Sequence, residues 1–177
     1  MILSEIIQAI HPLQVIGMSD NLQSLDIRHL LTDSRRLGSE PEATLFFALK
    51  TEKNDGAKYI PQLTERGVRV FVLEKSSLDQ LAQLDQLVQL NQLVFLVVDS
   101  SLAALQQLAA YKRSLYHGPV IAITGSNGKT VVKEWLYQLL KDDYRITRSP
   151  KSYNSQIGVP LSVWQLNEQT KLAIFEA

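Results

Sequence analysis

The sequence predicts an α/β protein with two parts, a small N-terminal α/β domain followed by the beginning of a parallel-sheet domain of the P-loop type. Short apolar runs alternate with helical patterns in the first part of the chain, which is typical of strand–helix layers. Further on, a glycine-rich loop joins an apolar run at 120–123 to a helical pattern at 131–140. The break His117-Gly118-Pro119 lies just before that run, so we expect domains at 1–117 and 118–177.

Composition excludes several classes of function. Apolar residues make up 45% of the 177 residues, enough for a core, and 18 basic residues balance 18 acidic ones. A zero net charge argues against nucleic acid as a partner. The chain has no cysteine, no apolar run of transmembrane length and no signal peptide at its start. We therefore expect a cytoplasmic location without membrane insertion.

Apolar runs and helical spacing predict the elements of the first domain. Gly67 follows one helical pattern as a C-cap, and Ser101 precedes another as an N-cap. Residues 50–56 form a polar loop. Leucines recur every third residue over 77–93, which gives no single apolar helix face, and we assign that segment no function. The expected strands are 15–16, 27–31, 44–49, 68–73 and 94–98, and the expected helices are 4–10, 57–66 and 101–115.

The loop after the apolar run 120–123 has the composition of a phosphate cradle. That run predicts a short buried strand, and the helix after the loop points its positive end at the same place. The usual pattern G-x-x-x-x-G-K-[ST] would begin at position 123, which is Ile123, so the loop is a variant. The candidate ATP-phosphate ligands are Thr124, Gly125, Ser126, Asn127, Gly128, Lys129 and Thr130.

Two of these residues have side chains suited to a nucleotide. Lys129 supplies a positive charge for the β- and γ-phosphates, and the Thr130 hydroxyl is placed to ligate Mg²⁺. Glu176 ends an apolar run at 171–175. If that run is a strand parallel to 120–123, the carboxylate reaches a Mg²⁺ ion held by Thr130. A solvated glutamate at a chain end is the alternative.

The rest of the second domain is expected to continue the same alternation. A strand at 144–147 leads into a polar loop at 149–155 and then a helix from about 157 to 166. Trp135 and Trp164 fall within helical patterns, so we expect both to be packing residues. The three histidines have no metal-ligand spacing.

These motifs together resemble the Mur ligase family, ATP-dependent enzymes of peptidoglycan synthesis. Thr124 to Thr130, Tyr153-Asn-Ser-Gln-Ile-Gly-Val-Pro160 and a strand ending in Glu176 resemble its central domain. Thr32-Asp-Ser-Arg35, Leu45-Phe-Phe-Ala-Leu49 and Asn54-Asp-Gly56 resemble its N-terminal, UDP-binding domain. The resemblance covers essentially the whole chain.

Asn154 followed by Ile157-Gly-Val-Pro160 resembles the type of Mur ligase that joins D-alanyl-D-alanine to UDP-MurNAc-tripeptide. The type that adds the third stem residue usually carries Thr-Thr-Pro there. The resemblance implies ATP and Mg²⁺ as cofactors, those two small molecules as substrates, an acyl-phosphate intermediate, and a role in cell wall, cell shape and cell division. In some bacteria such a ligase is fused to an alanine racemase.

The resemblance also implies roles for individual residues. Lys129 and Glu176 would be catalytic, and Thr130 and Glu176 would hold Mg²⁺. Each segment has a structural alternative: Asn154 could cap a helix, and the Asp33 segment could be a turn with a solvated ion pair. The implied contacts of the UDP-linked peptide are Asp33, Ser34, Arg35, Asn54, Asp55 and Asn154.

Two departures from the family pattern limit the resemblance. Ala57 stands where the family often has histidine, which leaves the uridine end unassigned. The family's central domain also continues past the magnesium glutamate, so we expect an N-terminal portion that is catalytically incomplete alone. Three alternatives stay open: the ligase of the third stem residue, a folylpolyglutamate synthase-like ligase, and a stand-alone nucleotide-binding module.

Overall fold

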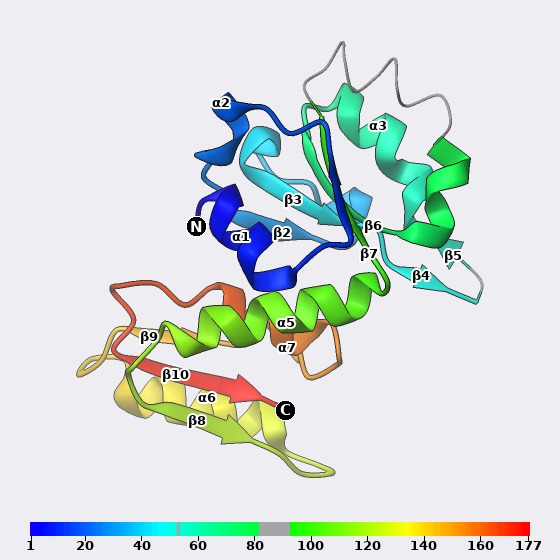
Figure 1. Ribbon diagram of the computed structural model, residues 1–177. Coiled ribbons are helices and arrows are strands. Elements are labelled where there is room, and N and C mark those ends of the chain that lie inside the picture. Colours follow the sequence, from blue (N-terminus) through cyan, green and yellow to red (C-terminus); the bar gives the residue numbers. More distant parts are fainter. Residues whose placement is uncertain (53, 82–92) are drawn as a thin grey trace. The chain divides into compact units, whose positions relative to one another are not determined.

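The computed structural model describes residues 1–52, 54–81 and 93–177 (Figure 1). The chain divides into two compact units, Met1–Ala104 and Leu105–Ala177. This division falls inside helix α5 (Ser101–Ser114). The functional boundary expected after residue 117 lies beyond the end of the same helix and stays a prediction.

The first unit is built on a five-stranded sheet. Its strand order is β1 (Gln14–Ile16), β7 (Val94–Val98), β6 (Val70–Glu74), β3 (Thr44–Phe47) and β2 (His29–Leu31). The last four strands are mutually parallel, and β1 joins the edge antiparallel to β7. Among its described residues, this unit contains the helices α1 (Leu3–Ile10), α2 (Asp20–Gln23) and α3 (Ile60–Glu65) and the first turn of α5 (Figure 1). The predicted α/β class is confirmed.

Three phenylalanines in register organise the core on one face of this sheet. Phe46 lies opposite Phe71, and Phe71 lies opposite Phe95, so one ring from each of β3, β6 and β7 stands side by side. The Phe71 ring contacts Phe46 edge-on, with centroids 6.3 Å apart, and stacks on Phe95 at 5.4 Å. Ile60 and Leu63 of α3 belong to the same buried cluster, so this cross-strand ladder fixes α3 to the sheet.

The connections of the first unit differ in detail from the expected ones. The predicted polar loop at 50–56 contains a hairpin of β4 (Lys50–Thr51) and β5 (Asn54–Asp55). The predicted helix 57–66 begins as the 3₁₀ turn η3 (Gly56–Tyr59) and continues as α3. Other 3₁₀ turns are η1 (Ser34–Arg36), η2 (Pro41–Ala43) and η4 (Lys75–Leu81). Most of the leucine-repeat segment 77–93 lies outside the described residues.

The second unit contains a parallel three-stranded sheet of order β8 (Val120–Ile123), β10 (Leu172–Glu176) and β9 (Ile146–Arg148). Its helices, besides most of α5, are α6 (Lys129–Leu140) and α7 (Gly158–Trp164). Figure 1 shows β8 and β10 side by side with their arrows in the same direction. The central strand β10 is buried throughout, and Ala173 and Phe175 pack with Val163 and Leu166.

Two burial predictions for this unit are wrong. The strand β8 was expected to be buried, but it is an edge strand with half-exposed and exposed residues. Trp135 was expected to pack, but it is 68% exposed, whereas Trp164 is buried as expected. Among the described residues, no helix combines the length and apolar character needed to cross a membrane.

Candidate functional site

The loop after β8 takes a backbone shape that depends on glycine. Gly125 has φ +144° and Gly128 has φ +76°, in the region that L side chains rarely adopt. A Cβ on Gly128 would meet nothing within 4 Å, so it is the backbone conformation, and not a lack of space, that requires glycine there. Gly128 precedes α6 directly, and the first-turn N–H groups of a helix have no partners within the helix. The loop therefore presents backbone donors and the positive helix end to one place.

The first two side chains of α6, those of Lys129 and Thr130, contact different partners. The Lys129 ammonium group donates a hydrogen bond to the Gly125 carbonyl at 2.6 Å, so its side chain folds back over the loop. The Thr130 hydroxyl donates to Glu176 Oε2 at 3.1 Å. The structure thus brings together three residues that the sequence proposed for one site.

Glu176 reaches this place because of sheet register. It lies opposite Ile123, the last residue of β8, and the carboxyl ends of parallel strands share one edge. Its side chain is fully buried, and its backbone N–H donates to Ser149 Oγ at 3.1 Å. The alternative of a solvated chain-end glutamate is therefore wrong.

Lys133 is a site residue that the sequence did not reveal. It is fully buried, and its Nζ lies 2.8 Å from Glu176 Oε1. The same Nζ donates to the Ser149 carbonyl at 2.9 Å and to the Lys151 carbonyl. The available signal was its spacing, because a residue three positions after Thr130 lies on the same side of a helix.

The donor set fits a magnesium ion. Glu176 Oε1 pairs with the Lys133 ammonium group at 2.8 Å, which leaves Oε2 as the carboxylate oxygen on the side of the Thr130 hydroxyl. Thr130 Oγ1 and a carboxylate are hard oxygen ligands of the kind that Mg²⁺ prefers. Among the described residues no cluster of three or more His, Cys, Asp or Glu side chains exists. A Mg²⁺ ion here would therefore take further ligands from phosphate and water.

The loop after β9, the third parallel strand, places Asn154 at the carboxyl ends of the strands, where the glycine loop and Glu176 also lie. The segment 149–157 follows the carboxyl end of β9 and carries Asn154 exposed to solvent. The Gly158 N–H at the start of α7 donates to Ser155 Oγ at 3.0 Å, so the side chain bonded to this helix start is that of Ser155 and not that of Asn154. A Cβ on Gly158 would lie 2.9 Å from the Tyr153 backbone, so the loop packs tightly on this helix start.

The proposed UDP-side residues of the first unit begin with η1, which follows β2. Arg35 and Asp33 form a two-bond pair, Nε to Oδ1 at 2.9 Å and Nη2 to Oδ2 at 2.8 Å. These hydrogen bonds lower the pKa of Asp33 to about 2, against the opposing effect of partial burial. Ser34 is buried, and its carbonyl accepts from Arg66. Arg35 stays 87% exposed, so its paired guanidinium still faces solvent.

Asn54 and Asp55 lie in the β4–β5 hairpin, which follows the carboxyl end of the neighbouring parallel strand β3. Asp55 Oδ1 accepts from the Ala57 N–H at 2.9 Å, and Oδ2 accepts from Ser77 Oγ at 2.8 Å. Both oxygens of Asp55 therefore have structural partners, whereas Asn54 is exposed. The two predicted UDP-side segments share one edge of the first sheet.

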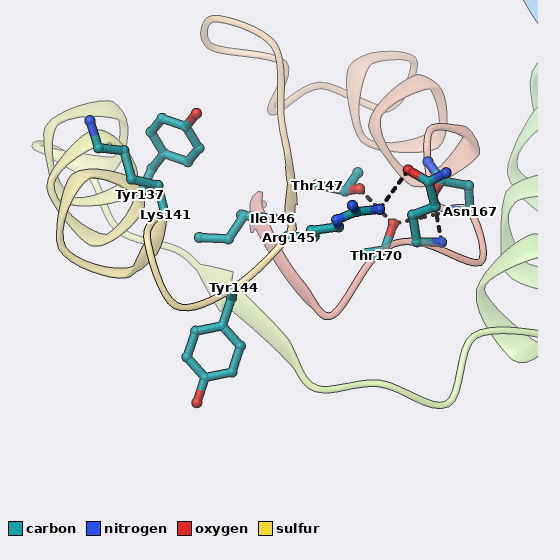
Figure 2. A pocket seen from close by; sticks show the side chains of 9 residues that line it. Tyr137, Lys141, Tyr144, Arg145, Ile146, Thr147, Asn167 and Thr170 are labelled. Carbon is teal, nitrogen blue, oxygen red and sulfur yellow. Dashed lines mark hydrogen bonds between the residues drawn. The ribbon is translucent and has the colours of Figure 1, made fainter.

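A surface pocket of ≈ 350 Å³ lies elsewhere in the second unit. Arg145 Nη1 donates to Gln169 Oε1 at 3.1 Å, and Figure 2 shows that Tyr144 points away from Arg145. The pocket lies where β9 and β10 begin, at the opposite edge of the sheet from the glycine loop. None of the predicted site residues lines it.

Comparison with known proteins identifies the class. The sequence matches the Mur ligase middle domain over residues 123–177 and the catalytic domain of the Mur ligase family over residues 26–113. The chain belongs to the Mur ligase family.

Its relatives define the type within the family. The UDP-N-acetylmuramoyl-tripeptide–D-alanyl-D-alanine ligase of Bacillus subtilis is 36% identical over 85% of this chain and 30% of its own length. The enzyme of that name from Haemophilus influenzae is 32% identical over 98% of this chain and 34% of its own length. The resemblance to the D-alanyl-D-alanine-adding type, MurF, is thus confirmed.

Solved structures agree with this assignment. A crystal structure of MurF from Acinetobacter baumannii matches 99% of this chain with a TM-score of 0.79 and 28% identity. MurF from Thermotoga maritima, solved in complex with ADP, matches 90% with a TM-score of 0.66 and 27% identity. The chain spans about a third of the length of these relatives.

Proposed function

We propose that residues 118–177 bind the phosphates of Mg·ATP and that residues 1–117 bind UDP-MurNAc-tripeptide, within a cytoplasmic ligase that adds D-alanyl-D-alanine in peptidoglycan synthesis. The observation that carries this proposal is the contact of Thr130 with the buried Glu176 at the end of the glycine loop. A hydroxyl and a carboxylate beside a helix N-terminus suit a metal–triphosphate complex.

The proposed reaction has two steps, in which these residues would bind the phosphates and neutralise their negative charge. The γ-phosphoryl group of ATP passes to the peptide's terminal carboxylate, which gives an acyl phosphate and ADP. The amine of D-alanyl-D-alanine then attacks the acyl carbon and releases phosphate. Lys129 and the N–H groups of the loop from Thr124 to Thr130 would hold the β- and γ-phosphates, because phosphoryl transfer depends mainly on positioning and charge neutralisation. Mg²⁺, when bound by Thr130 and Glu176, would neutralise the phosphate oxygens.

The UDP-linked substrate has a separate proposed surface. Asp33, Ser34 and Arg35 follow β2, and Asn54 and Asp55 follow β3, so both segments occupy one sheet edge. Arg35 is exposed and suits a diphosphate, although binding would have to compete with its pair to Asp33. Asn154 is exposed at the edge of the second sheet, where it would meet the reacting end of the peptide.

Calorimetric titration of the 177-residue chain tests both halves of the proposal. Mg·ATP should bind, and Lys129→Ala should weaken binding while Lys141→Ala, an exposed lysine near the other end of α6, should not. UDP-MurNAc-tripeptide should also bind, and Arg35→Ala should weaken it. Arg28→Ala is the matched control. Arg28 pairs with Glu40 and lies just before β2, whereas Arg35 lies after the other end of that strand. Binding of neither ligand would contradict the proposal for this chain.

A further inference from the structure

The buried ammonium group of Lys133 connects three segments of the second unit. Its nearest oxygens are Glu176 Oε1, the Ser149 carbonyl and the Lys151 carbonyl. These oxygens come from the end of β10 and from the loop that follows β9, while Lys133 itself lies on α6. An ammonium group has several N–H donors and no acceptor, so one side chain can donate to both carbonyls while its charge pairs with the carboxylate.

Stability alone does not account for this lysine. Replacing a buried ion pair by apolar residues of similar volume is often neutral or stabilising, so such a pair is weak evidence for a stabilising role. Its geometry is more informative. Lys133 faces Glu176 Oε1, and Thr130 faces Oε2, so the carboxylate is held between two residues of the same helix. That arrangement fixes the direction in which Oε2 points.

The same side chain restrains the loop that carries Asn154. Ser149 is held from both sides, because its carbonyl accepts from Lys133 while its Oγ accepts from the Glu176 N–H. Lys151 has a positive φ of 50°, an unfavourable backbone for a residue other than glycine, and its carbonyl is bonded to Lys133. The Lys133 bond therefore stabilises a turn that the sequence does not favour.

We propose that Lys133 is a positioning residue: it aims the Glu176 carboxylate at the metal position beside Thr130 and at the same time holds the loop 149–154 against α6. The metal part of this proposal rests on the proposed Mg·ATP site. Glu134 is a secondary partner, with Oε1 3.5 Å from Lys133 Nζ and Oε2 paired to Arg148.

The first test separates metal positioning from nucleotide binding. ATP binding to the whole chain is measured against Mg²⁺ concentration, and again in EDTA, for wild type, Lys133→Met and Lys141→Met. Loss of a residue that orients a metal ligand typically costs roughly 10- to 100-fold in metal affinity, so the half-saturating Mg²⁺ concentration of Lys133→Met should rise by that factor. Binding in EDTA should stay at the wild-type value, which a general loss of structure would not allow. Lys141→Met should behave as wild type throughout.

The second test needs no ligand. Hydrogen exchange of the amides of Lys151, Ser152, Tyr153 and Asn154 should be faster in Lys133→Met than in wild type or Lys141→Met. The proposal requires both changes, so a wild-type value in either measurement overturns it. If wild type binds no nucleotide, the proposed ATP site is wrong, and the exchange measurement still decides whether Lys133 holds the loop.

A variant that keeps the charge guards against loss of folding. Lys133→Arg retains a cation beside Glu176, but its planar guanidinium places the donors differently. It should stay folded, with a raised Mg²⁺ requirement and faster loop exchange. Wild-type behaviour of a folded Lys133→Arg in both measurements would overturn the proposal.

Discussion

Thr130 and Glu176 are 46 residues apart in the chain, yet the hydroxyl of one donates to the carboxylate of the other at 3.1 Å. The contact depends on two features that arise separately. The glycine loop starts α6 next to the end of β8, and the parallel pairing of β10 with β8 sets Glu176 opposite Ile123. A substitution that changes either the loop or the strand pairing should therefore alter the contact of Thr130 with Glu176.

Glu176→Gln should weaken Mg²⁺-dependent ATP binding by roughly ten-fold or more, as loss of an oriented metal ligand does. The amide removes the negative charge and leaves the buried ammonium of Lys133 without its nearest ion-pair partner. Calorimetry at fixed ATP and varied Mg²⁺ measures the effect. Glu168→Gln, at an exposed position in the turn before β10, is the control. Equal Mg²⁺ requirements in the two variants would remove Glu176 from the metal site.

Gly158→Ala should lower the free energy of unfolding by about 1–3 kcal/mol, the usual cost of overpacking. The added Cβ would lie 2.9 Å from the Tyr153 backbone, which cannot swing aside as a side chain can. Urea unfolding measures the change. The control is Gly38→Ala, where a Cβ meets nothing within 4 Å, and there the change should stay below about 1 kcal/mol in either direction.

Phe71→Ala should destabilise the first unit by about 3–5 kcal/mol, because a fully buried ring is replaced by a cavity. Phe71 contacts both neighbours of the phenylalanine ladder, so its loss leaves Phe46 and Phe95 without their shared partner. Trp135→Ala removes a larger ring that is 68% exposed, and it should change the free energy of unfolding by less than about 0.5 kcal/mol. Similar costs for the two variants would contradict the assigned core.

The Asp33–Arg35 pair predicts a specific response to pH. The pKa of Asp33 is lowered to about 2, so the pair contributes stability that is present above the ordinary Asp pKa and is lost as pH falls through the lowered one. Arg35→Gln should return the Asp33 pKa toward its ordinary value of about 4. Carboxyl NMR titration between about pH 5 and pH 1.5 covers both values, and an unchanged Asp33 pKa would show that Arg35 is not the cause.

The sequence predicted the fold where local patterns and packing agree. The runs that became β3, β6 and β7 are apolar because their strands are buried in a parallel sheet, and Gly-Lys-Thr before a helical pattern marked the start of α6. The burial predictions failed where burial depends on the place of an element in the fold. An apolar run such as β8 reads the same at an edge as at a centre, and Trp135 reads the same on either face of a helix.

The candidate site was predicted in part for a related reason. Glycine, lysine and threonine in a loop have few structural explanations, so Gly125 to Thr130 could be singled out from the chain alone. Lys133 could not, because a lysine in an amphipathic helix is normally exposed. Its burial depends on acceptors from 149, 151 and 176, which only the assembled sheet brings near α6.

The strand order β8-β10-β9 has a consequence for how the second unit is made. The central strand is the last of the three in the chain, so β8 and β9 leave the ribosome before β10, the partner that they share among the described strands. Lys133 likewise lacks its nearest ion-pair partner until residue 176 has been added. The first unit can fold while synthesis continues, since all five strands of its sheet precede residue 99. The sheet of β8, β10 and β9, by contrast, can form only after β10 has been translated, so the contact of Thr130 with Glu176 forms late.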